Sequence, residues 1–367
     1  MMCKGRLIIG CFLDMENFLD SRLAECIGTI KDRIEMRQNG TITDAEGVID
    51  LIEGDESFAQ LIIAVELDEF GLNEDMERFI RELRYMEDEK PLEGVVCGII
   101  VDGKGELYTK DAGRQLAFAM SRAGGILPGK PFVEATGNLR NFDIIAQNMN
   151  ARSNLEAYKR SCDDLITRVR NFEISDYLIK MPRILAIHAS SRKTSNSLAL
   201  WSMVRENLEG KAEIEEIQIR NGEIWDCRGC KFEQCLHHGE KGTCFYGGHM
   251  VEKVYPAVLK CDIIVFICPN YNDSVSADIM AVINRLTALF RTNDFSKKRM
   301  YAIVVSGYSG GDLVAKQIMG AINLNKNFML PGDFVLLATA NTPGSINEIP
   351  DIEEKAAAFA KRILLEY

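Results

Sequence analysis

The stretch that decides the fold is DIIVFICPNYNDSVS, residues 262–276. It opens on a nearly continuous apolar run, 262–268, which is typical of a parallel strand that is buried on both faces. Pro269 follows this run, and a segment of Asn, Asp and Ser side chains leads to helical periodicity from Val275 onward. A buried strand, a polar loop and a helix in this order form the repeating unit of an α/β fold.

The same unit recurs on both sides of this stretch. We expect strands at 183–189, 213–219, 262–268, 301–306 and 333–338, with helical segments between most of them. Five strands that alternate with helices predict a doubly wound parallel sheet. Ligands of such sheets bind at the carboxyl ends of the strands, near the point where the strand order reverses.

The first half of the chain repeats the pattern more faintly, with strand-like segments at 6–13, 60–67 and 94–101. Six of its residues recur 203 positions later without a gap, which indicates an internal duplication of one α/β unit, with chance similarity as the alternative. The pairs are Leu127 and Leu330, Pro128 and Pro331, Gly129 and Gly332, Ala135 and Ala338, Thr136 and Thr339, and Asn138 and Asn341. We therefore expect a first domain at 1–150, a connecting helix within 151–181, and a second domain at 182–367.

Composition limits the classes of protein that remain. The 367 residues carry a net charge of −11, and residues 1–150 alone hold 16 Lys and Arg against 28 Asp and Glu. Such a balance does not favour nucleic acid as a partner. No apolar run approaches the roughly 20 residues that a membrane helix needs, and no secretory signal is visible. Eleven cysteines without such a signal indicate a reducing compartment, so we expect a cytoplasmic protein.

Three polar or glycine-rich loops follow strands of the second domain and should meet at one edge of its sheet. The first precedes a helix, whose N-terminal amide groups attract phosphate, and the third has glycines that allow a flat ligand to approach the backbone. An ordinary helix cap and ordinary turns are the alternative interpretations. The candidate ligand residues are Ser190, Arg192, Asn196 and Ser197 in the first loop, Pro269, Asn270, Tyr271, Asn272 and Ser274 in the second, and Ser306, Gly307, Gly310 and Gly311 in the third.

Four cysteines are concentrated in residues 227–244, within a longer loop. Cys227, Cys230, Cys235 and Cys244 place four thiols within 18 residues, which suggests a metal centre. Compact spacing suits a [4Fe–4S] cluster held by four thiolates, whereas structural zinc more often uses two separated Cys-x-x-Cys pairs. Nearby histidines keep zinc open as an alternative, as does a set of unmetallated or dithiol cysteines.

Together these loops resemble those of the flavodoxin-like NADPH-dependent FMN reductase family, and of its iron–sulfur flavoprotein branch in particular. Residues 189–197 are similar to the family's phosphate loop, Gly-Ser-Pro-Arg-x-x-x-Asn-Ser/Thr, with Ala189 and Ser191 in place of Gly and Pro. Residues 269–277 resemble its Pro-x-Tyr-x-x-x-x-Ser segment beside the flavin ring, and 306–311 its glycine-rich ring loop. Residues 227–230 resemble its Cys-x-Gly-Cys element.

The resemblance covers about 183–345 and implies a flavodoxin-like fold there; together with the internal duplication, it leads us to expect two tandem flavodoxin-like domains, of which the first is degenerate. Its first strand leads into an acidic segment, 13–17, so we expect no flavin site there. In the second domain it implies bound FMN, electron transfer with NAD(P)H as a donor, and no obligatory catalytic side chain. The partners would be small molecules or small proteins that donate and accept electrons, and a homo-oligomer is compatible with this class. A non-enzymatic electron-transfer protein and a zinc-bearing scaffold with a decayed flavin site are the alternatives.

Overall fold

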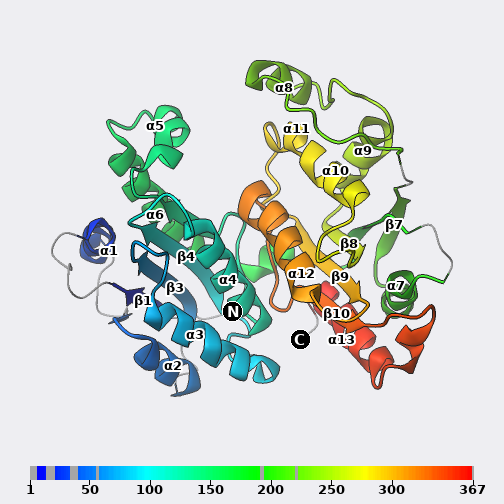
Figure 1. The fold of residues 1–367 in the computed structure, drawn as a ribbon, viewed down its shortest axis with the longest axis horizontal. Coiled ribbons are helices and arrows are strands. Elements are labelled where there is room, and N and C mark those ends of the chain that lie inside the picture. The colour runs from blue at the N-terminus through cyan, green and yellow to red at the C-terminus, as the bar shows by residue number, and fades with distance from the viewer. Residues whose placement is uncertain are drawn as a thin grey trace. The chain divides into compact units, whose positions relative to one another are not determined.

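The computed structural model describes residues 6–13, 21–33, 40–54, 58–190, 194–219 and 222–365. The chain forms two compact units, each of which we describe by itself (Figure 1). The first comprises Met1–Phe172 and Pro331–Asp333, and the second comprises Glu173–Leu330 and Phe334–Tyr367. No helix within the described ranges is long and apolar enough to cross a membrane.

The described part of the first unit contains a five-stranded sheet in which all strands are parallel. Its spatial order is β2-β1-β3-β4-β5, the flavodoxin order of doubly wound folds. The strands are β1 (Arg6–Phe12), β2 (Gly40–Ile42), β3 (Phe58–Leu67), β4 (Val96–Gly103) and β5 (Phe132–Ala135). The helices are α1 (Arg22–Arg33), α2 (Ala45–Gly54), α3 (Glu74–Tyr85), α4 (Thr109–Arg122), α5 (Asp143–Met149) and α6 (Asn154–Arg170).

The second unit has the same connectivity in its described residues, with the order β10-β9-β8-β6-β7 and parallel pairing throughout. Its strands are β6 (Arg183–His188), β7 (Glu213–Gln218), β8 (Ile263–Pro269), β9 (Arg299–Ser306) and β10 (Val335–Thr339). Its helices are α7 (Asn196–Leu208), α8 (Phe232–Gly239), α9 (Tyr255–Lys260), α10 (Ala277–Arg285), α11 (Thr287–Phe290), α12 (Gly311–Met319) and α13 (Ile352–Leu364). The predicted fold class, tandem flavodoxin-like α/β domains, is confirmed.

The central strands form the core of each unit. All eight residues of β4 and all eight of β9 are buried, as their apolar sequences predict. The offset of 203 in the sequence reappears in the sheet register: Gln60 pairs with Val96 in the first unit, and Ile263 pairs with Arg299 in the second. The duplicated sequence therefore corresponds to duplicated strand pairing.

The first unit contains more regular structure than its sequence pattern suggests. The structure adds the strands β2 and β5 and the helices α1, α2 and α5 to the three strands expected there. The helix expected as a connection is α6, and its apolar face packs on the first sheet through Tyr158, Cys162 and Leu165. The division between the units falls after Phe172, because this face of α6 belongs to the first core.

Candidate functional site

Four loops follow β6, β8, β9 and β10 at one edge of the second sheet, because parallel strands end on the same side. They are residues 189–195, 270–276, 307–310 and 340–344. The first three are the loops singled out in the sequence. The fourth was not among the candidates, although its Asn-Thr-Pro-Gly run, 341–344, has the composition of a turn.

The first loop leads into α7, whose N-terminus is capped by Ser195. The Ser195 hydroxyl accepts a hydrogen bond from the Leu198 amide at 3.4 Å. The Ser190 carbonyl accepts one from the Gln218 side chain at 2.8 Å, and Ser197 is buried. Arg192 lies outside the described residues. The described part thus places serine hydroxyls around the start of a 13-residue helix, where the helix dipole favours an anion.

Asn196, the first residue of α7, contacts the loop after β10. Its Nδ2 donates to the Ala340 carbonyl at 3.1 Å and to the Thr342 carbonyl at 2.8 Å. Its Oδ1 accepts from the Gly344 amide at 2.9 Å. Both Nδ2 protons therefore have backbone acceptors in the loop after β10.

The strand that precedes α7, β6, ends at a buried histidine. His188 is 7% exposed, and its Nδ1 has no hydrogen-bond partner within the described ranges. Burial lowers the pKa of this imidazole, because a low-dielectric surrounding disfavours the charged ring. A neutral ring at the end of β6 adds no positive charge to the site near neutral pH.

The second loop makes a tight turn with left-handed backbone at both central residues. The amides and carbonyls of Tyr271 and Ser274 pair with each other, and φ is +52° at Asn272 and +56° at Asp273. This is the geometry of a type I′ turn, which Asn and Asp tolerate better than most residues. The turn leaves the Tyr271 side chain 61% exposed, where an aromatic face is accessible to a planar ligand.

Asn270 connects the second loop to the third. Its Nδ2 donates to the Ser309 carbonyl at 2.7 Å, and also lies 3.3 Å from the Ser306 hydroxyl and 3.2 Å from Asp273 Oδ1. Its Oδ1 is buried and has no partner among the described residues. A buried amide oxygen of this kind requires a donor, such as a ligand N–H.

The third loop passes close to the second at Gly310. Its φ is +76°, and a Cβ built there would lie 1.9 Å from Asp273 Oδ1. Only glycine accommodates both that conformation and that approach. Three of the four loops therefore contact one another at this edge. Asn270 joins the 270–276 loop to the 307–310 loop. The Asn341 side chain joins the 340–344 loop to the 307–310 loop, because it donates to the Tyr308 hydroxyl at 2.7 Å.

The cysteine-rich segment begins after β7 and includes α8. Cys227 is exposed, whereas Cys230, Cys235 and Cys244 are partly buried. The Cys230 sulfur lies 3.8 Å from the Tyr246 hydroxyl, and this contact raises the pKa of that phenol. In the part of the chain that the structure describes, no three His, Cys, Asp or Glu side chains gather closely enough to hold a metal. The donor chemistry suits an iron–sulfur cluster, but the observed arrangement is not a formed metal site.

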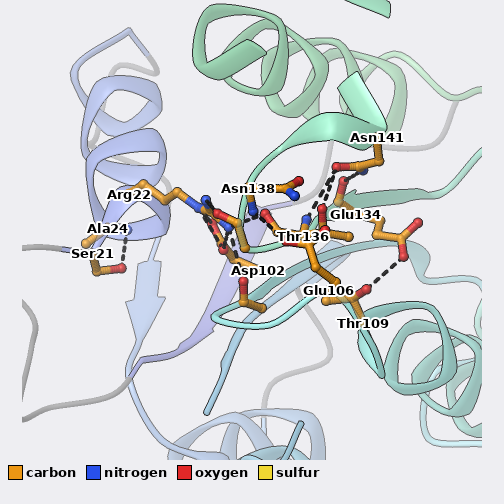
Figure 2. Close-up of polar contacts among 12 residues, drawn as sticks. Ser21, Arg22, Ala24, Asp102, Glu106, Thr109, Glu134, Thr136, Asn138 and Asn141 are labelled. Atoms are coloured by element: carbon orange, nitrogen blue, oxygen red, sulfur yellow. Dashed lines mark hydrogen bonds and ion pairs between the residues drawn. The ribbon is translucent and has the colours of Figure 1, made fainter. Parts of the chain in front are cut away.

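The equivalent edge of the first sheet carries a side-chain network (Figure 2). Both Arg22 Nε and Nη2 donate to the Asp102 carboxylate, at 2.9 and 2.6 Å, and Nη1 donates to the Gly137 carbonyl at 2.8 Å. Burial raises the pKa of Asp102, and Arg22 opposes this shift. A cavity of about 280 Å³ adjoins this pair and is also lined by Glu66 and Lys104.

The second unit alone provides the residues that would contact FMN. The phosphate would meet the start of α7 with its serine hydroxyls, while the ring would meet the glycine-rich loop and the Tyr271 face. The unpartnered Asn270 Oδ1 suits an N–H of a flavin ring, which is otherwise rich in acceptors. The residues present therefore fit the cofactor.

Known proteins that are similar to this chain indicate its family. Residues 182–342 match the family model of the NADPH-dependent FMN reductases. Two iron-sulfur flavoproteins of Archaeoglobus fulgidus are similar: one is 31% identical over 146 residues, covering 39% of this chain and 72% of the relative, and the other is 27% identical, covering 50% and 94%. An azoreductase structure from Bacillus anthracis is 12% identical with a TM-score of 0.37, covering 51% of this chain and all of that one. The chain belongs to the NADPH-dependent FMN reductase family, in its iron–sulfur flavoprotein branch.

Proposed function

We propose that the second unit binds FMN at the edge formed by its four loops, and that the protein is an oxidoreductase which takes electrons from NAD(P)H. The observation that carries this proposal is Asn270, whose amide nitrogen joins two loops while its buried oxygen is left without a partner. A family match over 182–342 supports the cofactor.

The residues of this edge would bind and orient the cofactor. The hydride and electron chemistry would be supplied by FMN when it is bound, so the residues of this edge would not have to provide an acid or a base. The start of α7, with Ser190 and Ser195, would hold the phosphate. Asn270 would accept a hydrogen bond from the ring, and Gly310 would let the ring lie close to the backbone. Tyr271 and Tyr308, 61% and 81% exposed, would flank the entrance for a small-molecule acceptor.

We propose separately that the cysteine-rich segment binds an iron–sulfur cluster. The support is the four-thiol donor set and the names of the two relatives. Because the described thiols are not gathered into a metal site, this segment would have to rearrange on binding, and no step of the flavin chemistry is assigned to it. Anaerobic purification with iron and zinc analysis tests this: we expect iron that Cys230→Ser removes while flavin is retained. A protein that contains zinc, or no metal, would refute it.

The flavin proposal is tested by titrating the apoprotein with FMN and following the quenching of flavin fluorescence. We expect Asn270→Ala to weaken FMN binding by about tenfold, since a hydrogen bond made in a buried site contributes about 1 kcal/mol or more. Asn207→Ala is the matched control, because among the described residues the Asn207 amide bonds to the Met203 carbonyl within α7. An unchanged affinity in Asn270→Ala would refute the assignment of the ring site.

Oxidation of NADPH and NADH by the FMN-loaded protein tests the second half of the proposal. Turnover with a quinone or azo dye as acceptor would establish a reductase. Bound FMN without nicotinamide oxidation would instead favour a carrier that passes electrons between other proteins.

A further inference from the structure

We propose that Asn196 is a positioning residue of the flavin site, which acts by fixing the 340–344 loop and not by binding phosphate. This inference rests on the proposed FMN site. Asn196 makes three hydrogen bonds to the backbone of that loop, at Ala340, Thr342 and Gly344. A side chain that spans five residues of a neighbouring loop restricts the conformation of that loop, and its own amide protons are used in doing so.

The 340–344 loop in turn contacts the glycine-rich ring loop. The Ala340 amide donates to the Ser306 carbonyl at 2.9 Å, and Asn341 Nδ2 donates to the Tyr308 hydroxyl at 2.7 Å. Gly307 packs so closely that an added Cβ would lie 3.0 Å from Asn341 Oδ1. The contacts therefore run from the start of α7, where the phosphate would bind, through the 340–344 loop, to the loop beside the flavin ring.

The first unit contains the same arrangement with a different side chain. Ser21 precedes α1 and accepts from the Ala24 amide at 3.1 Å, as Ser195 accepts from Leu198 before α7. The next residue is Arg22, the counterpart of Asn196, and it donates to the carbonyls of Thr136 and Gly137 at 2.7 and 2.8 Å. Gly137 corresponds to Ala340 by the offset of 203.

Both units have a hydrogen bond from the first residue of the first helix to the loop after the last strand, and in the first unit this bond does not involve phosphate binding. Arg22 directs its guanidinium to a carboxylate and to three backbone carbonyls, so its bonds to the loop after β5 need no phosphate. The two units thus keep the bond between the first residue of the first helix and the loop after the last strand, although they differ in the polar residues around it. The bond therefore belongs to the scaffold that sets the loops in place.

The experiment compares FMN with riboflavin, which lacks the phosphate. Wild type, Asn196→Ala and the control Asn207→Ala are titrated with each flavin. We expect Asn196→Ala to lose about tenfold in affinity for both flavins, because the loss acts through the ring loop. If only FMN binding falls, Asn196 is a phosphate ligand and the proposal is refuted; if neither falls, it is refuted as well.

A second measurement needs no flavin. Hydrogen–deuterium exchange of the apoprotein should show faster exchange in peptides that cover 340–345 in Asn196→Ala, because the Gly344 amide loses its acceptor. Unchanged exchange would overturn the proposal. If wild type binds neither flavin while exchange still rises, the FMN site is wrong and the positioning contact stands.

Asn341→Ala provides a variant that leaves the Asn196 contacts in place. It removes the donor to the Tyr308 hydroxyl, so both flavins should bind more weakly while the Gly344 amide keeps its protection. Unchanged affinity for both flavins would show that the 340–344 loop does not act through the ring loop.

Discussion

Replacing Gly310 by alanine directly tests the contact between the 270–276 and 307–310 loops, which we call the two ring loops. Its φ of +76° is unfavourable for alanine, and the new Cβ would lie 1.9 Å from Asp273 Oδ1 and 3.0 Å from Asn270 Nδ2. Gly210 is the matched control, since its φ is +73° but a Cβ there meets nothing within 4 Å. The two variants share the backbone cost and differ only in the collision.

The structure gives the size of each contribution. A left-handed alanine costs about 1 kcal/mol relative to glycine. Asp273 must also move, which breaks its hydrogen bond with Asn270 and costs about 1 kcal/mol more. We therefore expect the free energy of unfolding to fall by about 2 kcal/mol in Gly310→Ala and by about 1 kcal/mol in Gly210→Ala. Because the displaced Asp273 and Asn270 belong to the proposed ring site, we separately expect roughly fivefold weaker FMN binding in Gly310→Ala alone, which is about 1 kcal/mol of binding free energy.

Tryptophan fluorescence during urea unfolding is the appropriate assay. The chain has two tryptophans, Trp201 and Trp225, and both belong to the second unit, so excitation near 295 nm reports on that unit selectively. Flavin titration of the same samples gives the affinities. If Gly310→Ala and Gly210→Ala lose equal stability and bind FMN equally, the two ring loops do not depend on each other as the structure implies.

Three further predictions concern buried titratable groups. Burial lowers the pKa of Lys326 to about 8, so its charge at pH 7 destabilises the folded second unit. We expect Lys326→Met to raise the free energy of unfolding of this unit by about 2 kcal/mol at pH 7. In parallel urea titrations this gain should disappear between pH 8 and about 10.4, where the lysine of the unfolded chain also loses its proton. The pKa of His188 is lowered in the folded protein, so the unfolded chain binds the proton first as the pH falls. The free energy of unfolding should therefore be constant with respect to this group above about pH 6.5 and decrease below it. In His188→Gln, tryptophan fluorescence should show a smaller decrease over the same pH range. Asp102→Asn leaves Arg22 without its buried partner and should destabilise the first unit by about 3 kcal/mol, seen as faster hydrogen exchange in β4, whereas the exposed Asp111→Asn should have little effect.

The strand pattern of the second unit was predictable because its buried strands are nearly continuous apolar runs. The same reasoning missed β2, a three-residue edge strand whose sequence is Gly-Thr-Ile. An edge strand of that length has no periodicity to detect, and its pairing with Ile8–Gly10 of β1 comes from the sheet and not from its own residues. The apolar face of α6 was visible in the sequence, but which core it joins depends on tertiary packing.

The sequence was sufficient to predict which loops form the site, but not which residues of these loops contact one another. Polar residues after parallel strands must meet at one edge, so the three candidate loops could be found from the sequence. Asn196, however, bonds to residues 144 and 146 positions further along the chain, which no local pattern encodes. The fourth loop was missed for the same reason, since its role comes from the Asn196 and Tyr308 side chains that contact it.

The two units show how one scaffold carries different chemistry at the same edge. Strand pairing and the bond to the last loop do not depend on what fills the edge, so the side chains there are free to change. In the first unit the guanidinium of Arg22 uses most of its donors on Asp102 and on backbone carbonyls, and Glu66 adds a second carboxylate to the adjoining cavity. The lining of that cavity therefore combines two carboxylates with two cations, Arg22 and Lys104, whereas the start of α7 in the second unit presents serine hydroxyls. Removing Arg22 alone would leave Asp102 buried without its cation, so conversion of this edge into an anion site requires changing both members of the pair.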